Sequence, residues 1–167
     1  MTPAEFLNDA YQRVLQTSTD AVDGLTVEQL AHPPEPDANP IGWLVWHLAR
    51  VQDDHVADVA GTEQVWTEQG FADRFDLPFD VAATGFGQSA AEVGQVRADA
   101  GLLAEYLRAV HEQTTSYVAS LTPGDLDRVV DTRWDPPVTL GLRLVSVVSD
   151  DLQHAGQAAY LRGLRGA

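Results

Sequence analysis

Apolar side chains recur every three or four residues in four segments of this 167-residue chain, which predicts four amphipathic helices. The first has three start signals: Thr2 as an N-cap, Pro3 at the first helical position and Glu5 three residues after the cap. Pairs such as Asn39-Pro40 open later segments in a similar way. The predicted helical segments are 2 to about 24, 39–61, 89–121 and 139 to about 163.

The connections between these segments are long. The first connection spans residues 25–39, and its part from 30 to 39 holds three prolines, at 33, 34 and 36, which predict a loop. Residues 62–88 form an aromatic-rich stretch that we expect to be irregular and functional or packed as a lid. Gly94 and Gly101 could separate a short helix from the start of the third segment, and only residues 127–133 weakly resemble a strand. We therefore expect one all-α domain over residues 1–167, an antiparallel four-helix bundle with long crossover connections.

The charge of the chain excludes several classes of function. It has 25 acidic residues against 10 arginines, with no lysine and no cysteine, and its formal net charge is −15. Nucleic acids and anionic membranes both need a basic surface, so we expect neither as a partner. Disulfides, cysteine-ligated metal and a cysteine nucleophile are excluded. No apolar run reaches membrane-spanning length and the first residues do not resemble a signal peptide, so we expect a cytoplasmic protein.

The last predicted helix has ionisable residues on its apolar side. His154 lies near the centre of the apolar face, and Asp150 lies one turn before it on the same side. Asp151 falls on the other flank of the stripe. Burying such groups in a bundle core costs several kcal/mol unless they are paired or bind a cation. A divalent metal would reverse this balance.

A metal site in a bundle needs a further ligand from a facing helix, and His47 in the second helix is the best candidate. His47, Asp150 and His154 would leave one coordination position open, which is typical of a catalytic site. Zinc, nickel and iron(II) all tolerate such ligands.

Other interpretations of these residues stay open at this point. Each histidine could be an ordinary core residue, and the two aspartates could pair with Arg50 or Arg143 in a structural network. His55, two turns after His47, is either a reserve ligand or a core residue.

Two motifs resemble the DinB/YfiT-like superfamily of metalloenzymes, and the resemblance extends over essentially the whole chain. Residues 39–50, NPIGWLVWHLAR, resemble its second helix, and residues 150–157, DDLQHAGQ, resemble its last. The resemblance implies a four-helix bundle with a long crossover and one divalent metal, usually zinc or nickel. The implied ligands are His47, Asp150 and His154. Most members have His where this chain has Asp150, and the mycothiol-dependent maleylpyruvate isomerases have Glu, so Asp151 could substitute as a ligand or support one.

Several members of that superfamily are transferases or isomerases that use a low-molecular-weight thiol. The resemblance therefore implies a metal-dependent, mycothiol-type enzyme acting on a small molecule, and a homodimer is plausible. Because the chain has no cysteine, any thiolate must come from a cofactor. Arg50, Asp54 or Asp151 are expected to orient the ligands, and residues 66–86 to cover the groove. The rival hypothesis is a non-catalytic bundle that has lost its metal and serves as a binding or dimerisation module.

Overall fold

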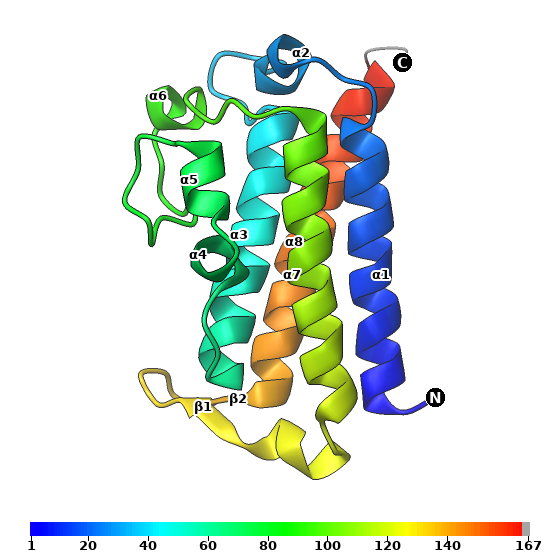
Figure 1. Ribbon diagram of the computed structural model, residues 1–167. Helices are drawn as coiled ribbons and strands as arrows, with labels where there is room; N and C mark the ends of the chain where they lie inside the picture. The colour runs from blue at the N-terminus through cyan, green and yellow to red at the C-terminus, as the bar shows by residue number, and fades with distance from the viewer. Residues whose placement is uncertain (165–167) are drawn as a thin grey trace.

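Four long helices form the bundle in the computed structural model, which describes residues 1–164 (Figure 1). This confirms the all-α class and the four-helix bundle with a long crossover. Apart from the start of α7, which lies eleven residues after the predicted start, the helices begin and end within a few residues of the predicted positions. They are α1 (Pro3–Val22), α3 (Ile41–Ala60), α7 (Ala100–Ser120) and α8 (Leu140–Leu164).

The order of the helices in space differs from a simple up-and-down bundle. Helices α1 and α3 each pack against both α7 and α8 and lie diagonally opposite each other. Helices α1 and α8 run in one direction, and α3 and α7 run in the other (Figure 1). The expected antiparallel packing therefore holds for α1 with α7 and for α3 with α8. The neighbouring pairs α3–α7 and α1–α8 run parallel instead, because the crossover, residues 61–99, returns the chain to the end where α3 began before α7 starts.

Local capping explains where the helices start. Thr2 and Glu5 form the expected capping box of α1, and the Asp99 carboxylate accepts a hydrogen bond from the Leu102 backbone N–H at 2.8 Å to cap α7. Ser89 caps only a short helix, α6 (Ala90–Val93), because the chain leaves the helix at Gly94. The third predicted segment is therefore two helices.

The connections contain more regular structure than the sequence indicated. A missed capping box, Thr26 with Gln29, starts helix α2 in the first connection, just before the predicted loop. The aromatic-rich stretch, residues 62–88, contains two short helices. The weak strand signal at residues 127–133 corresponds to the first strand of a two-stranded antiparallel hairpin. These elements are α2 (Val27–Ala31), α4 (Val65–Glu68), α5 (Phe71–Phe75), η1 (Pro123–Asp127), β1 (Val129–Asp131) and β2 (Val138–Thr139). Within residues 1–164, no helix is long and apolar enough to cross a membrane.

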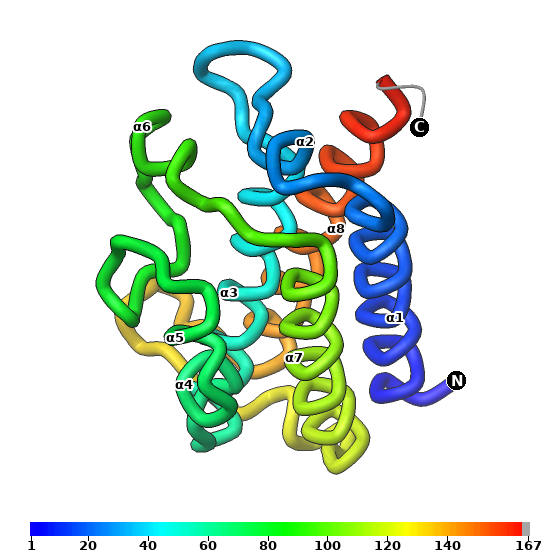
Figure 2. The backbone as a smooth tube through the Cα atoms, turned by 45° about the horizontal axis from the view of Figure 1, so that its top comes forward, coloured from blue at the N-terminus to red at the C-terminus, as the bar shows by residue number. Residues whose placement is uncertain are grey.

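A buried arginine on α3 fastens the crossover to the bundle. The Arg50 side chain is completely buried, and its guanidinium lies 3.6 Å from the Asp53 carboxylate. It donates hydrogen bonds to the Ala83 carbonyl at 3.1 Å and to the Gln64 side chain at 2.8 Å. Asp53 in turn accepts hydrogen bonds from the backbone N–H groups at positions 65 and 66 and from the Tyr106 hydroxyl. The crossover therefore lies against α3 and α7, on the opposite side from α1 (Figure 2).

A second charged cluster joins the hairpin to α8. The buried Asp131 carboxylate accepts hydrogen bonds from Arg133, through both its backbone and its guanidinium, and from Arg143 at 3.1 Å. The hydrogen bonds from Arg133 hold the pKa of Asp131 well below its ordinary value, and the charges of both arginines contribute.

We predict that Arg50→Met lowers the free energy of unfolding by about 3–5 kcal/mol, because it leaves Asp53 buried without its cation. Urea unfolding followed by circular dichroism measures this. Arg13→Met is the matched control, because Arg13 pairs with Asp9 on the exposed surface and should leave stability unchanged. Equal losses in both variants would contradict a special role for Arg50.

The Asp131 cluster predicts a pH-dependent contribution to stability. Because the folded pKa lies below the unfolded value, the contribution is present above about pH 4 and is lost as the pH falls toward the folded pKa. Asp131→Asn should therefore melt at a lower temperature than the wild type at pH 7, and the difference should shrink below pH 4. A difference that stays constant over this range would exclude the ionised carboxylate as its source.

Candidate metal centre

His47, Asp150 and His154 converge where α3 packs against α8. Each offers one ligand atom, and the three atoms lie within 4.8 Å of one another. Two atoms bound to one metal through bonds of about 2 Å lie at most about 4 Å apart, so the three side chains would move slightly closer together around an ion. His47 is buried, whereas Asp150 and His154 are partly exposed. The structure thus brings together the three residues that the sequence predicted as ligands.

The hydrogen bonds of His47 leave one ring nitrogen ready to bind a cation. Its Nδ1 lies 2.6 Å from the Thr84 carbonyl oxygen, which can only accept, so Nδ1 carries the proton and Nε2 keeps its lone pair. The Trp43 ring stacks on the imidazole at 4.5 Å and fixes its plane. Burial lowers the pKa of His47, and the nearby His154 adds to this shift, although Thr84 and Asp150 oppose it. His47 is therefore neutral at neutral pH.

The two α8 residues are oriented in a similar way. His154 Nδ1 donates a hydrogen bond to Gln157 Oε1 at 2.9 Å, which leaves its Nε2 on the side of Asp150 Oδ1, 3.7 Å away. Asp150 Oδ2 is buried and has no hydrogen-bond partner among residues 1–164. Two imidazole lone pairs and an unpaired carboxylate oxygen form a donor set that fits a divalent cation.

The structural network considered from the sequence is not formed. Arg50 pairs with Asp53, and Arg143 donates hydrogen bonds to Asp131 and to the Nδ1 atom of His55. Within the described chain, neither arginine makes an ion pair with Asp150 or Asp151.

Asp151 lies outside the group of three. Its side chain is completely buried, and neither carboxylate oxygen has a hydrogen-bond partner in the part of the chain that the structure describes. Burial raises the pKa of Asp151 well above its ordinary value, and the charge of Asp150 raises it further. Burial raises the pKa of Tyr11 on α1, and the nearby Asp151 raises it further.

A cavity of about 570 Å³ adjoins the group of three. His55, expected as a reserve ligand or a core residue, instead lines this cavity and lies half-buried. Asp54 also lines it and accepts a hydrogen bond from the Gln64 side chain at 2.9 Å. The crossover contributes Thr84 and Phe86 to the lining of the cavity. The lining comprises His47, Val51, Asp54, His55, Thr84, Phe86, Arg133, Ser146, Val147 and Asp150.

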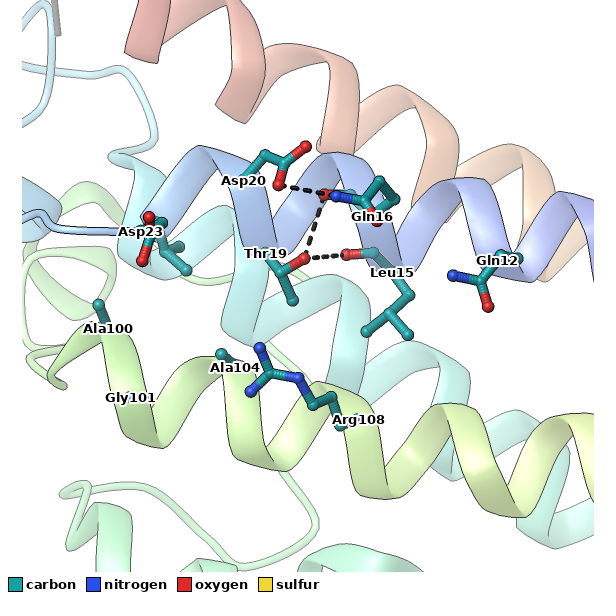
Figure 3. A pocket seen from close by; sticks show the side chains of 11 residues that line it. Gln12, Leu15, Gln16, Thr19, Asp20, Asp23, Ala100, Gly101, Ala104 and Arg108 are labelled. Carbon is teal, nitrogen blue, oxygen red and sulfur yellow. Dashed lines mark hydrogen bonds between the residues drawn. The ribbon is translucent and has the colours of Figure 1, made fainter.

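Another cavity, of about 420 Å³, lies between α1 and α7 (Figure 3). It exists because Ala100, Gly101 and Ala104 give α7 a small surface there, and the Arg108 side chain extends across it (Figure 3). Among residues 1–164, no histidine lines this cavity. The cavity beside His47 is therefore the better candidate for chemistry.

A model of the DinB superfamily matches residues 10–158. The chain belongs to the DinB superfamily. A solved structure with the same architecture is described as a conserved protein of locus from Enterococcus faecalis. It is 29% identical to this chain with a TM-score of 0.90, and the match covers 97% of this chain and 96% of that one. No curated protein matches the chain.

Several residues that orient the candidate ligands of this DinB superfamily member were not predicted. Gln157 was within the quoted motif, three residues after His154, and that helical spacing could have identified it. Thr84 acts through its backbone carbonyl, so its residue type gave no signal. Trp43, which stacks on His47, also donates a hydrogen bond to Gln88 at 2.8 Å, and this bond joins the crossover to the same end of α3.

Gly85 lets the crossover approach His47 closely. Its φ is +95°, and a Cβ atom there would lie 2.9 Å from His47 Nδ1 and 2.9 Å from the Trp46 ring. Real Cβ atoms do not come so close to other heavy atoms, so any other residue must displace the loop or the imidazole.

We predict that Gly85→Ala weakens zinc binding about 10- to 100-fold, because it displaces the group that orients His47. Competition with a chromophoric chelator measures this affinity. Gly87→Ala is a matched control in the same loop: its φ is +76°, but its Cβ would meet nothing within 4 Å. If both variants lost affinity equally, backbone strain would explain the loss and the contact with His47 would not.

Proposed function

We propose that this protein is a metal-dependent enzyme in which His47, Asp150 and His154 hold one divalent cation, zinc or nickel. The supporting observation is the donor set itself. Both imidazoles donate Nδ1–H to a fixed oxygen, and a buried Asp150 oxygen has no partner within residues 1–164. The rival hypothesis is a non-catalytic bundle that has lost its metal. Such a bundle would not need these side chains to be held in ligand orientations.

The cavity beside the ligands supports catalysis rather than a purely structural ion. Three protein ligands leave a coordination position for a small molecule, and the cavity provides room for one at His47 and Asp150. Its walls are mixed, with apolar contacts from Val51, Val147 and Phe86 and a positive charge from Arg133. When bound, the metal supplies a Lewis acid that lowers the pKa of a thiol or of water.

We favour a thiol as the activated group and a mycothiol-type cofactor as its source. The chain has no cysteine, so the sulfur arrives with the cofactor. In a transfer reaction, sulfur forms a bond to an electrophilic carbon and the leaving group departs with its electron pair, while the thiol proton passes to solvent. The residues of this chain bind and orient: Trp43 and Thr84 fix His47, and Gln157 fixes His154.

Metal removal provides the direct test. Protein stripped with chelator should take up about one equivalent of zinc or nickel, and His154→Ala should lose this uptake, since two ligands bind far more weakly than three. His111→Ala is the control, because His111 lies on α7 outside the group of three. Uptake below about a tenth of an equivalent by the wild type would refute the metal site and favour the non-catalytic bundle.

The thiol step needs a separate measurement. Metal-loaded wild type should accelerate conjugation of mycothiol with a fluorogenic alkyl halide, and both the stripped protein and His154→Ala should not. Stoichiometric metal uptake without any thiol acceleration would leave the metal site standing and contradict the thiol assignment.

A further inference from the structure

His55 offers a hydrogen-bond donor in the cavity beside the candidate ligands. Its Nδ1 lies 3.2 Å from the Arg143 Nη1 atom. A guanidinium only donates, so Nδ1 is the acceptor and the ring proton lies on Nε2. Burial lowers the pKa of His55, and the charge of Arg143 lowers it further, although nearby carboxylates oppose the shift. The imidazole is therefore neutral at neutral pH, with an accessible Nε2–H that has no partner within residues 1–164.

This tautomer is the opposite of that found in the two candidate histidine ligands. In His47 and His154, Nδ1 carries the proton and Nε2 keeps its lone pair. His47 and His55 line the same cavity, but only a lone pair suits a cation, and His55 does not belong to the group of three. The histidines of this cavity therefore divide two tasks, since His47 accepts a cation and His55 donates a hydrogen bond.

Arg133 is joined to His55 by a chain of contacts along the cavity wall. Arg143 donates to the Asp131 carboxylate at 3.1 Å, and Asp131 also accepts from Arg133 Nε at 3.0 Å and Nη2 at 2.8 Å. These bonds fix one edge of the Arg133 guanidinium, while its Nη1 group makes no hydrogen bond in the described part of the chain. Because two arginines share one carboxylate, the cluster keeps a positive charge beside the cavity.

The donors and the candidate ligands lie at different levels of the interface between α3 and α8. These helices pack together and run in opposite directions (Figure 1). His55 follows His47 by eight residues, which is about 12 Å along the α3 axis, and there it meets Arg143 of α8. Val51 and Val147 fall between the two levels on their helices and line the cavity. A molecule that reached both levels would therefore be elongated, with an apolar middle.

The charges around the cavity favour a molecule with one negative charge. With a divalent cation bound, the carboxylates of Asp54 and Asp150 in the lining balance the ion, and the Asp131 cluster keeps its single positive charge. The charge of Asp58 also reaches this cluster, but Asp58 is exposed and water screens it. One carboxylate on the bound molecule would neutralise what remains.

We propose that His55 and Arg133 bind a carboxylate of the substrate, an elongated organic acid whose reactive carbon lies at the other end of the cavity. This substrate class rests on the proposed function, because it places the reacting end at His47 and Asp150. A carboxylate has two oxygens, which accept from His55 Nε2–H and from the free edge of the Arg133 guanidinium. His55 thus determines specificity and is not a metal ligand.

Nitrogen NMR of the metal-free wild type tests the donor directly. His55 should carry its proton on Nε2, whereas His47 and His154 should carry it on Nδ1, and His55→Gln assigns the signal. A proton on Nδ1 of His55 would overturn the proposal whatever the metal content, because the accessible nitrogen would then be an acceptor.

Calorimetric titration of the zinc-loaded protein with hexanoate, and with hexanamide as its uncharged counterpart, tests the substrate class. The wild type should bind hexanoate more tightly than hexanamide, and Arg133→Gln and His55→Phe should each weaken hexanoate binding about three- to tenfold. Arg133→Gln should leave hexanamide binding unchanged. Arg108→Gln is the matched control, since it removes the same charge beside the cavity between α1 and α7. Circular dichroism checks that each variant is folded.

Zinc uptake separates failure of the substrate class from failure of the proposed function. A zinc-loaded wild type that binds hexanoate no more tightly than hexanamide refutes the substrate class alone. Equal hexanoate affinity in the wild type, Arg133→Gln and His55→Phe would assign the carboxylate to the metal and would also refute it. A wild type that takes up no zinc refutes the proposed function and this substrate class together.

Discussion

The buried guanidinium of Arg50 is the interaction on which the site most depends. It joins α3 to the crossover through the Ala83 carbonyl, and Thr84, the next residue, provides the carbonyl that accepts from His47. A single network therefore stabilises the fold and selects which nitrogen of His47 remains free. Arg50 was expected to orient ligands directly, whereas the structure shows that it acts through the backbone of a distant segment.

The carboxylates in the core and at the candidate site fall into two classes. Asp53 is stabilised by two backbone N–H groups, the Tyr106 hydroxyl and Arg50. Asp150 has one buried oxygen without a partner, and both oxygens of Asp151 lack one within residues 1–164. Unpaired buried carboxylates are costly. For Asp150 the geometry supplies a reason, because its carboxylate lies beside two oriented imidazoles. For Asp151 the structure shows the cost without a compensating contact.

Features that depend on the local sequence pattern could be predicted, whereas the course of the chain and contacts with the backbone of distant segments could not. The four long helices followed from apolar periodicity and capping residues, and the three candidate ligands followed from helical spacing and resemblance. The parallel course of α3 and α7 could not be predicted, because residues 61–99 are long enough to return to either end. Thr84 could not be identified either, since a carbonyl is common to every residue type. Helix α2 was missed although Thr26 and Gln29 form an ordinary capping box.

The placement of the candidate ligands has a consequence for folding. His47 and Asp150 are separated by about 100 residues of chain, including the entire crossover, α7 and the hairpin. An ion held between them would act as a cross-link between distant parts of the polypeptide, and its affinity for the native state would add to the free energy of folding. The amount of folded protein in a cell would then vary with the supply of that ion, so that abundance as well as activity would follow metal availability.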